Sequence, residues 1–474
     1  MQKLNEICSC ESKANSETEF VGIRCEKSKE DGALETSIIF PLGYFKDDSA
    51  LRELPEEELR ECVVNLFMVL SDASLQEQIH QDSSISTFAE EHGESEFPMV
   101  SYLNVIRNFL DFGYLDEKEI LYKKGANGKI SWGRTIKAVQ PVITEDAQNL
   151  VYLNFVARKV SYNEDTLITQ VHKFCVHDAL VKLGFLFGID PSEEPQLDFD
   201  YDLFCNAIHS KLAKTFNDCD LRLLADLARI VEYLAGHKTE DGKTANEFYF
   251  GVNTFAPVWE GMVDRIFGKL PQGTAKDKFN PHCEWDLSSG ARGYENPNYA
   301  MRPDTIMWDE EGNRLYVLDA KYYKFGVTGS AADLPSSGSI CKQIAYAEYV
   351  ETHWKTILGV DSIATPSASL QNDTQPKPIY NAFLLPYCFN ADNSQLPPDD
   401  GFETRPCKMR FIGHCHGNWK NLDARPGEVD YRPYHRIAGI LLDVRSVMEN
   451  YGALGEAQKT LATCILRENS NLSE

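Results

Sequence analysis

Two aspartates and a lysine mark the ends of two short apolar segments in the second half of the chain. Asp304 opens the first segment, and Asp319 and Lys321 close the second, within RPDTIMWDEEGNRLYVLDAKYYKF (residues 302–325). Side chains two residues apart on a strand share a face, and the polar turn between the segments predicts a hairpin that brings Asp304 alongside them. A carboxylate in such an apolar setting needs a cation. Lys321 could supply it in a structural ion pair, or a divalent metal could bind both aspartates.

The metal-binding interpretation predicts phosphodiester hydrolysis. Mg²⁺ prefers oxygen ligands, and a bound metal polarises a phosphate and activates a water molecule. Lys321 would then orient or deprotonate that water, or stabilise the charge that develops on the phosphate. An Asp-x-Lys triplet is common by chance, but Glu260, in VWEGMVD, offers a third carboxylate ligand. Gln343 and Tyr346, three residues apart in KQIAY, share a face of a helix downstream.

The surrounding pattern predicts an α/β core that would position these residues. A helix precedes the hairpin, and the helix ICKQIAYAEYVETHWKTIL follows it. Strands IYNAFLLPY, MRFIGHC and RIAGILLDV and a final helix come next. This order favours a mixed central sheet flanked by helices, and we assign residues 246–474 to that domain.

Residues 1–150 are predicted to form a mixed α+β module, and residues 151–245 a helical region. FVGIRC and SIIFPL flank a polar turn and predict a β-hairpin. One helix is expected after Pro55, where acids fill the first turn, and another ends near Gly113. The helical region shows apolar residues three and four apart in two long stretches. Polar stretches predict two loops, at residues 80–98 and 362–378.

A basic segment in the first module carries the most distinctive local charge pattern. Residues 120–140 hold no acid and five cations, Lys123, Lys124, Lys129, Arg134 and Lys137. The segment predicts two strands around a Gly/Asn turn, and Trp132 adds a flat aromatic face that could stack or wedge. This wing could contact DNA or an acidic protein partner, or it could be a solvated hairpin.

The same segment contains GANGKIS, which is not a phosphate-binding loop. Only two residues separate its glycines, and isoleucine follows the lysine where Ser or Thr is required. Any nucleotide hydrolysis would therefore need a separate chain.

The composition excludes several classes of protein. The chain has 474 residues, 43% of them hydrophobic, which is enough for a large core and several domains. Its net charge of -25 argues against a generally basic surface for nucleic acid. No apolar run approaches the roughly 18 residues of a membrane helix, and the N-terminus lacks the apolar core of a signal peptide, so we expect a cytoplasmic protein without a membrane partner.

The cysteines favour a reduced protein. Their number, 13, is odd and their spacing irregular, which predicts free thiols. The adjacent His414, Cys415 and His416 would alternate between the faces of a strand, which disfavours a zinc site.

The candidate site resembles that of the PD-(D/E)xK nuclease superfamily. Glu260 matches the acid on the first core helix, Asp304 the acid of the PD motif, and Asp319 with Lys321 the following acid-x-Lys motif. The glutamine and tyrosine on the downstream helix match the Q-x-x-Y motif of the RecB-like branch. The resemblance implies that all six residues belong to one catalytic site.

A closer resemblance covers residues 120–350. GKISWGRTIK, RPD, LDAKYYKF and LPSSGSICKQIAYAEYV together resemble the LlaJI-family restriction endonucleases, which are McrC-like subunits. The resemblance implies an Mg²⁺-dependent endonuclease that cuts double-stranded DNA with a separate McrB-like AAA+ GTPase. It also implies that the N-terminal part engages the GTPase, so the basic segment could serve that partner rather than DNA.

Three further points follow from this interpretation. Cutting both DNA strands needs two active sites, so dimerisation is expected. A RecB-like repair exonuclease would use the same residues. A non-catalytic DNA-binding subunit, with a purely structural ion pair in the hairpin, is the other alternative.

Overall fold

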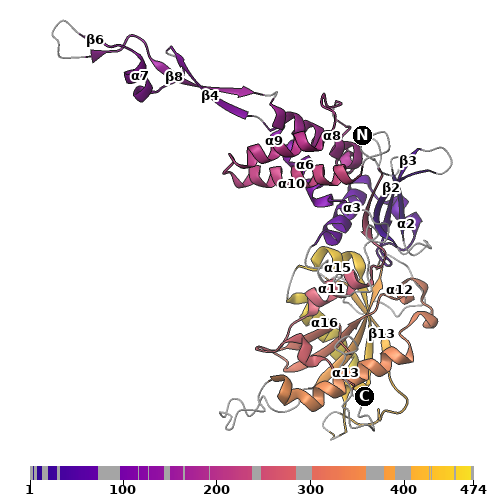
Figure 1. Cartoon of the computed structure of the whole chain (residues 1–474). Coiled ribbons are helices and arrows are strands. Elements are labelled where there is room, and N and C mark those ends of the chain that lie inside the picture. Colours follow the sequence, from indigo (N-terminus) through magenta and orange to yellow (C-terminus); the bar gives the residue numbers. More distant parts are fainter. Residues whose placement is uncertain are drawn as a thin grey trace, which may run out of the picture. The chain divides into compact units, whose positions relative to one another are not determined.

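The computed structural model covers the whole chain in two compact units (Figure 1). It describes residues 4, 8–12, 20–28, 33–72, 97–115, 117–125, 127–143, 150–163, 166–191, 193–237, 247–283, 301–358, 378–389, 407–425, 428, 430–452 and 455–470. The first unit comprises Met1–Gln2 and Glu94–Phe248, and the second combines Lys3–Gly93 with Tyr249–Glu474. The domain boundary predicted near residue 246 lies close to the division between Phe248 and Tyr249. Residues 3–93, which were expected in a separate N-terminal module, group instead with the C-terminal part of the chain. The loops predicted at residues 80–98 and 362–378 lie almost wholly outside the described residues.

The second unit contains a five-stranded mixed sheet, as the sequence predicted. In spatial order its strands are β10 (Thr305–Asp309), β11 (Arg314–Ala320), β12 (Ile379–Tyr387), β14 (Ile437–Asp443) and β13 (Met409–Cys415). Strands β11, β12 and β14 are parallel, while β10 and β13 run antiparallel to their neighbours. The carboxyl ends of the three parallel strands and the amino ends of β10 and β13 therefore meet at one edge, here called the carboxyl edge.

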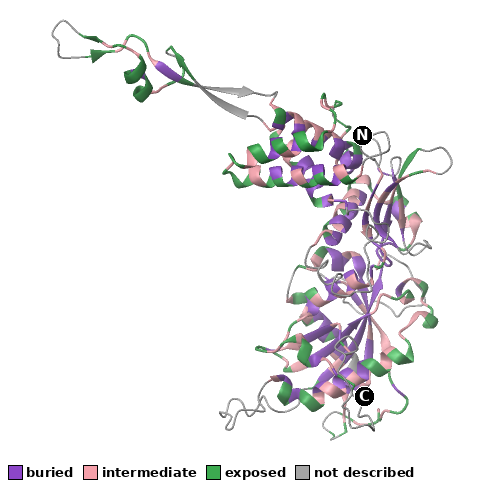
Figure 2. Ribbon diagram, viewed as in Figure 1, coloured by how far each residue is buried: buried purple, intermediate pink, exposed green. Residues whose placement is uncertain are grey.

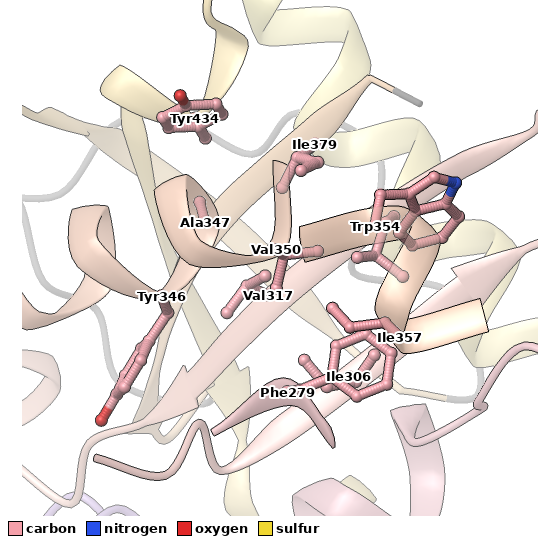
Figure 3. Packing of buried hydrophobic residues seen from close by; sticks show 11 residues of the cluster. Phe279, Ile306, Val317, Tyr346, Ala347, Val350, Trp354, Ile357, Ile379 and Tyr434 are labelled. Atoms are coloured by element: carbon pink, nitrogen blue, oxygen red, sulfur yellow. The ribbon is translucent and has the colours of Figure 1, made fainter. Parts of the chain in front are cut away.

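Helices α11 (Ala256–Phe267), α13 (Ser337–Leu358) and α16 (Glu456–Ser470) pack on this sheet. The buried cluster around α13 includes Ile306, Val317, Tyr346, Val350 and Trp354 (Figure 3). Asp319 lies two residues beyond Val317 and so shares the face that α13 covers. The shorter elements of this part are α12 (Phe325–Thr328), α15 (Val444–Asn450) and the 3₁₀ turns η1 (Lys276–Phe279), η3 (Ala331–Asp333) and η5 (Pro433–His435).

A four-stranded sheet completes the second unit. Its strands, in spatial order, are β1 (Cys8–Ser12), β3 (Leu34–Phe40), β2 (Val21–Lys27) and β9 (Phe248–Val252). The predicted hairpin is the antiparallel β2–β3 pair. Helices α2 (Asp48–Glu53) and α3 (Glu56–Leu70) follow, and α3 begins after Pro55 as predicted and buries its apolar face. Two ion pairs connect α3 and its C-terminal end to other helices of this unit. Arg445 of α15 pairs with Glu58 of α3 at 2.7 Å, and Arg265 of α11 pairs with Asp72, just after α3, at 2.6 Å.

The first unit is built mainly from helices. They are α6 (Met99–Phe112), α8 (Leu167–Phe187), α9 (Tyr201–Leu212) and α10 (Asp218–Gly236). Thr166, Asp200 and Asn217 each cap the amino end of a helix with a side-chain oxygen. The two long stretches with apolar residues at helical spacing are helices, as is the segment that ends before Gly113, but residues 156–163 of the predicted helical region form a strand.

A long β-arm, residues 117–143 and 150–163, projects from these helices within the first unit. Its sheet has the order β4 (Glu117–Lys124), β8 (Val156–Asn163), β5 (Lys129–Ile130), followed outward by α7 (Trp132–Ala138) and the pair β6 (Val142–Ile143) and β7 (Leu150–Val151). The two-stranded wing predicted over this segment is wrong, because β4 pairs with β8, and most of the expected second strand is helix α7. The reason is a non-local partner: Val156 of β8 donates its N–H to the buried Thr135 hydroxyl of α7 at 2.9 Å. Figure 2 shows that the described residues of the arm are mostly exposed.

Among the described residues, no helix is both long enough and apolar enough to cross a membrane. The thirteen cysteines are all free thiols.

Candidate active site

Asp304, Asp319 and Lys321 meet at the carboxyl edge of the five-stranded sheet. Thr305 pairs with Leu318 in the β10–β11 register, so the next position outward sets Asp304 opposite Asp319. The Lys321 ammonium donates to Asp319 Oδ1 at 2.7 Å and lies 3.9 Å from Asp304 Oδ2. The hairpin therefore brings together the three residues that the sequence singled out.

The charges at this edge are unbalanced. Burial raises the pKa of Asp304 well above its usual range, and a hydrogen bond with Asp319, the Asp319 charge and the Glu260 charge raise it further. Burial by itself would lower the pKa of Lys321, but the charges of Asp319 and Asp304 outweigh it and leave that pKa raised. Lys321 thus pairs with both Asp319 and Asp304, and a bound cation would relieve the repulsion between these two carboxylates.

The edge is also open to solvent. The Lys321 side chain is 22% exposed and that of Asp304 18%, whereas Asp319 is 6% exposed. The backbone N–H of Ala320 donates to Asp304 Oδ2 at 2.9 Å, which holds that carboxylate in place. A phosphate could therefore approach from the side of Lys321 and Asp304.

Glu260 lies on α11, the helix before the hairpin, as the sequence predicted. Its side chain is half-buried, and its charge acts on both Asp304 and Lys321. One turn later on the same helix, Asp264 accepts a hydrogen bond from the Lys276 ammonium at 2.8 Å. Lys276 also donates to the backbone carbonyl of Asp304 at 2.5 Å. Sequence reasoning missed Lys276, because nothing near it in the sequence signals a contact with a carbonyl 28 residues away.

Gln343 and Tyr346 both contact backbone rather than the carboxylates. The Gln343 amide donates to the Val317 carbonyl of β11 at 2.7 Å, and the Tyr346 hydroxyl donates to the Arg302 carbonyl at 3.0 Å. Both side chains are buried. These two hydrogen bonds connect α13 to the strand of Asp319 and to the segment before Asp304.

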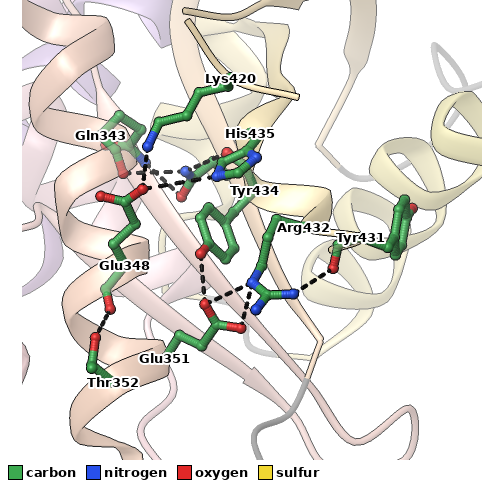
Figure 4. A network of polar contacts seen from close by, with 10 residues as sticks. Gln343, Glu348, Glu351, Thr352, Lys420, Tyr431, Arg432, Tyr434 and His435 are labelled. Carbon is green, nitrogen blue, oxygen red and sulfur yellow. Dashed lines mark hydrogen bonds and ion pairs between the residues drawn. The ribbon is translucent and has the colours of Figure 1, made fainter. Parts of the chain in front are cut away.

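A polar network extends this attachment further along α13 (Figure 4). Asn381 of β12 donates to the backbone carbonyls of Gln343 and Tyr434, at 3.1 and 2.9 Å. Glu351 accepts hydrogen bonds from Arg432 and from the Tyr434 hydroxyl, at 2.9 and 2.6 Å. The network holds the segment before β14 against α13 on the face that carries the candidate site.

The donor set is compatible with Mg²⁺. Within the described ranges, no three His, Cys, Asp or Glu side chains converge into a metal-binding group. Asp304 and Asp319 form a pair, and Mg²⁺ is commonly held by one or two carboxylates with water completing its coordination. Glu260 acts on this pair through its charge, and a direct bond from Glu260 to a metal stays a prediction.

The basic residues of the β-arm are exposed. Lys123, Lys124, Lys129, Trp132, Arg134 and Lys137 all reach solvent. The Arg134 guanidinium lies over the Tyr122 ring at 3.8 Å, and Trp132 meets the Phe155 ring edge to face at 5.7 Å. Sequence reasoning missed a group of exposed apolar side chains on the arm. They are Ile136, which lies among the cations on α7, and Val142, Ile143, Leu150, Val151 and Leu153 further along the arm. The arm thus combines cations with an apolar outer part.

Comparison with known proteins finds similarity to restriction enzymes. The model of a family described as LlaJI restriction endonuclease matches residues 39–395. The chain is 24% identical over 248 residues to the type II restriction enzyme BsuMI component YdjA of Bacillus subtilis (strain 168). This alignment covers 50% of the chain and 51% of that protein, so the chain spans about half the length of this curated relative.

Among solved structures, this chain is similar to a chain in the refined half-complex from a tetradecameric assembly of Thermococcus gammatolerans McrB AAA+ hexamers with bound McrC. The match has a TM-score of 0.33 and 12% sequence identity, and it covers 95% of this chain and 82% of that chain. A likeness at this level carries no argument about function.

Proposed function

The chain belongs to the LlaJI restriction endonuclease family, and from this membership and its acidic edge we propose that it is the Mg²⁺-dependent DNA-cleaving subunit of a restriction system. One observation carries the proposal. Asp304 and Asp319 share a single lysine at a solvent-accessible edge, where the excess of negative charge suits a divalent metal. A structural ion pair alone would need only one acid for Lys321.

The proposed roles follow from position and charge. Asp304 and Asp319 would hold the metal, and Glu260 adds negative charge or a third ligand. A bound Mg²⁺ would polarise the scissile phosphate and lower the pKa of a bound water. Lys321, directed at both aspartates, would stabilise the charge that develops on the phosphate. Gln343 and Tyr346 would keep the strand and the segment before Asp304 in register with α13.

Cleavage of DNA by the purified chain, assayed together with the proposed GTPase partner, tests this proposal. We expect Mg²⁺-dependent cleavage by the parent and a loss of at least about 100-fold in Asp319→Asn, a change that removes one charge without changing size. Asp423→Asn, at an exposed loop position, is the matched control. Cleavage by Asp319→Asn at the parent's rate would rule out this site.

A covalently closed circular substrate separates the proposed endonuclease from an exonuclease. An endonuclease opens the circle, whereas a repair exonuclease of the RecB-like kind leaves it intact until an end is supplied. Reactions with closed and linearised forms of the same DNA give a direct comparison. Digestion of only the linear form would replace the endonuclease proposal with the exonuclease alternative.

We also propose that the β-arm binds a protein partner, the separate AAA+ GTPase of such a system. The support comes from the apolar outer part of the arm, because exposed apolar side chains in such a group indicate a protein interface rather than a phosphate backbone. The relative from Bacillus subtilis is itself named as a component of its enzyme.

Replacing apolar side chains of the arm tests the choice of partner. Ile143→Ser with Leu150→Ser should weaken binding to the GTPase by at least about tenfold, which corresponds to about 1.4 kcal/mol. Val181→Ser, at an exposed position on α8, is the control. If the arm contacts DNA instead, Lys129→Ala or Arg134→Ala should lower the salt dependence of DNA binding by about one unit.

A further inference from the structure

A pocket of about 320 Å³ lies at the carboxyl edge of the five-stranded sheet, beside the candidate active site. Cys388 follows β12, Lys408 precedes β13 and Asp443 ends β14, and all three line the pocket. Strand β12 is the direct neighbour of β11, which carries Asp319. Asp319 is level with Phe383 of β12 and Gly439 of β14, so Asp443 lies two strands across and four residues further along. At about 4.8 Å per strand and about 3.3 Å per residue, the pocket lies roughly 16 Å from Asp319.

The loop after β3 closes the other side of this pocket and also reaches the candidate site. The backbone N–H of Leu42 donates to the Tyr322 hydroxyl at 2.6 Å, and Tyr322 directly follows Lys321. Four residues after Leu42, Lys46 lines the pocket. Gly43 holds the loop close, since its φ is +82° and an added Cβ would lie only 3.0 Å from the Tyr387 nitrogen. The same short loop therefore connects the pocket to the residue next to Lys321.

The acids of the pocket are already engaged by other groups. The Asp443 carboxylate accepts hydrogen bonds from the backbone N–H groups of Phe389 and Ser446, at 3.0 and 2.8 Å. Glu449 pairs with Arg445 at 3.0 Å, and Arg445 also pairs with Glu58 at 2.7 Å. These contacts occupy oxygens of both acids, and the positive charge of Lys408 also acts on Asp443.

Two lysines give the pocket positive charge. Lys46 and Lys408 form no ion pair with any described residue, although the chain carries an excess of acids. Tyr44 also lines the pocket, and its buried hydroxyl has only the weakly bonding Cys62 thiol beside it among the described residues. Two lysines that line one preformed pocket suit an anion with several oxygens.

We propose that this pocket binds a phosphate group through Lys46 and Lys408. The source that fits its position is the DNA backbone flanking the cleaved bond, because the pocket shares an edge with Asp304 and Asp319. This assignment rests on the proposed nuclease function. A free phosphate or a nucleotide would present the same chemistry, and the experiment separates these sources.

The salt dependence of DNA binding, measured without divalent metal, tests the site. The double variant Lys46→Ala with Lys408→Ala should lower the slope of log affinity against log salt by about one to two units relative to the parent. The control removes two exposed lysines elsewhere, Lys355→Ala with Lys459→Ala, and should leave the slope nearer that of the parent. Each single lysine variant reports on one contact if the double variant does not fold.

A second measurement identifies the source of the phosphate. Inorganic phosphate, compared with chloride at equal ionic strength, is added while thermal unfolding is followed. An unchanged DNA slope, with a phosphate-induced rise in Tm that is lost in the double variant, would assign the pocket to free phosphate. An unchanged slope with no specific phosphate effect would overturn the proposal.

Cleavage is assayed separately with Mg²⁺. Loss of the proposed nuclease function would show as a parent that does not cut DNA, while the salt slope and the phosphate response would still report on the pocket.

Discussion

Two aspartate–lysine pairs in this chain differ in how completely their charges are balanced. In the first unit, Lys182 of α8 donates to one oxygen of Asp178, and the Tyr102 hydroxyl donates to the other at 2.6 Å. All three side chains are buried, and the charges match one to one. The acid is thus fully satisfied by its neighbours.

At the carboxyl edge of the second unit the balance is different. Asp319 pairs with Lys321, but Asp304 and the charge of Glu260 compete for the same ammonium, and the group is partly exposed. An aspartate and a lysine in contact are therefore no sign of chemistry by themselves. An excess of acid at an open edge is what distinguishes the candidate site from a structural ion pair.

The largest expected contrast comes from removing one acid from each pair. Asp178→Asn leaves Lys182 buried without a counter-charge, which should lower the free energy of unfolding by about 3–5 kcal/mol. Asp319→Asn leaves Lys321 beside Asp304, so the free energy of unfolding should fall much less, or rise, while cleavage is lost. Denaturant titration of both variants checks this. Equal destabilisation would mean that the two pairs are alike and that the edge is structural.

The second prediction concerns how the stability of the first unit depends on pH through His172. His172 of α8 is buried and accepts a hydrogen bond from the Leu115 N–H at its Nδ1, and burial lowers its pKa to about 4. Because the unfolded chain binds this proton near pH 6.5, stability should be lost as the pH falls from about 6.5 to about 4, by roughly 3 kcal/mol.

Replacing the imidazole isolates this contribution. His172→Asn keeps a hydrogen-bond acceptor and should flatten the pH dependence of thermal unfolding in that window. His177→Asn, on the same helix, is the control. A pH profile for His172→Asn that matches the parent's would show that His172 does not titrate as the structure indicates.

The third prediction concerns metal binding, which only the unbalanced pair should show. Mg²⁺ at about ten times its Kd should stabilise the parent by about 1.4 kcal/mol, and Asp304→Asn should lose that gain. Asp178 is not expected to contribute, because its oxygens are occupied. Thermal unfolding with MgCl₂, against NaCl of equal ionic strength, measures the difference. A gain that persists in Asp304→Asn would place any metal elsewhere.

The smallest expected effect comes from a positioning residue at the edge. Tyr346→Phe removes the hydrogen bond to the Arg302 carbonyl and should lower the free energy of unfolding by about 1 kcal/mol. Tyr349→Phe, three residues along the same helix, provides the comparison. If both variants unfold at the same denaturant concentration as the parent, the Tyr346 hydroxyl does not hold the segment before Asp304.

The local features of this protein were predictable from the chain. Helix α3 follows from Pro55, a run of acids and apolar residues at helical spacing, all within fifteen residues. The hairpin and the shared face of Asp319 and Lys321 follow from strand alternation. The β-arm could not be predicted in the same way, because the partner of β4 lies more than thirty residues away in β8. The Gly/Asn turn after β4 predicted that the segment directly after the turn would pair with β4. In the structure, β4 pairs instead with the more distant β8.

The sequence by itself determined the residue types of the candidate site and their order in the hairpin. The turn between the strands and the two-residue spacing of Asp319 and Lys321 are local features, so they can be recognised without the fold. Only the tertiary structure decided their environment. It placed Glu260 within electrostatic reach of Asp304, tied Lys276 to the Asp304 carbonyl, and brought Lys46 and Lys408 into one pocket. These contacts join segments that no local pattern relates, since they depend on how the sheet and its covering helices pack. Balanced and unbalanced aspartate–lysine pairs look alike in a sequence, and burial with the surrounding charges tells them apart.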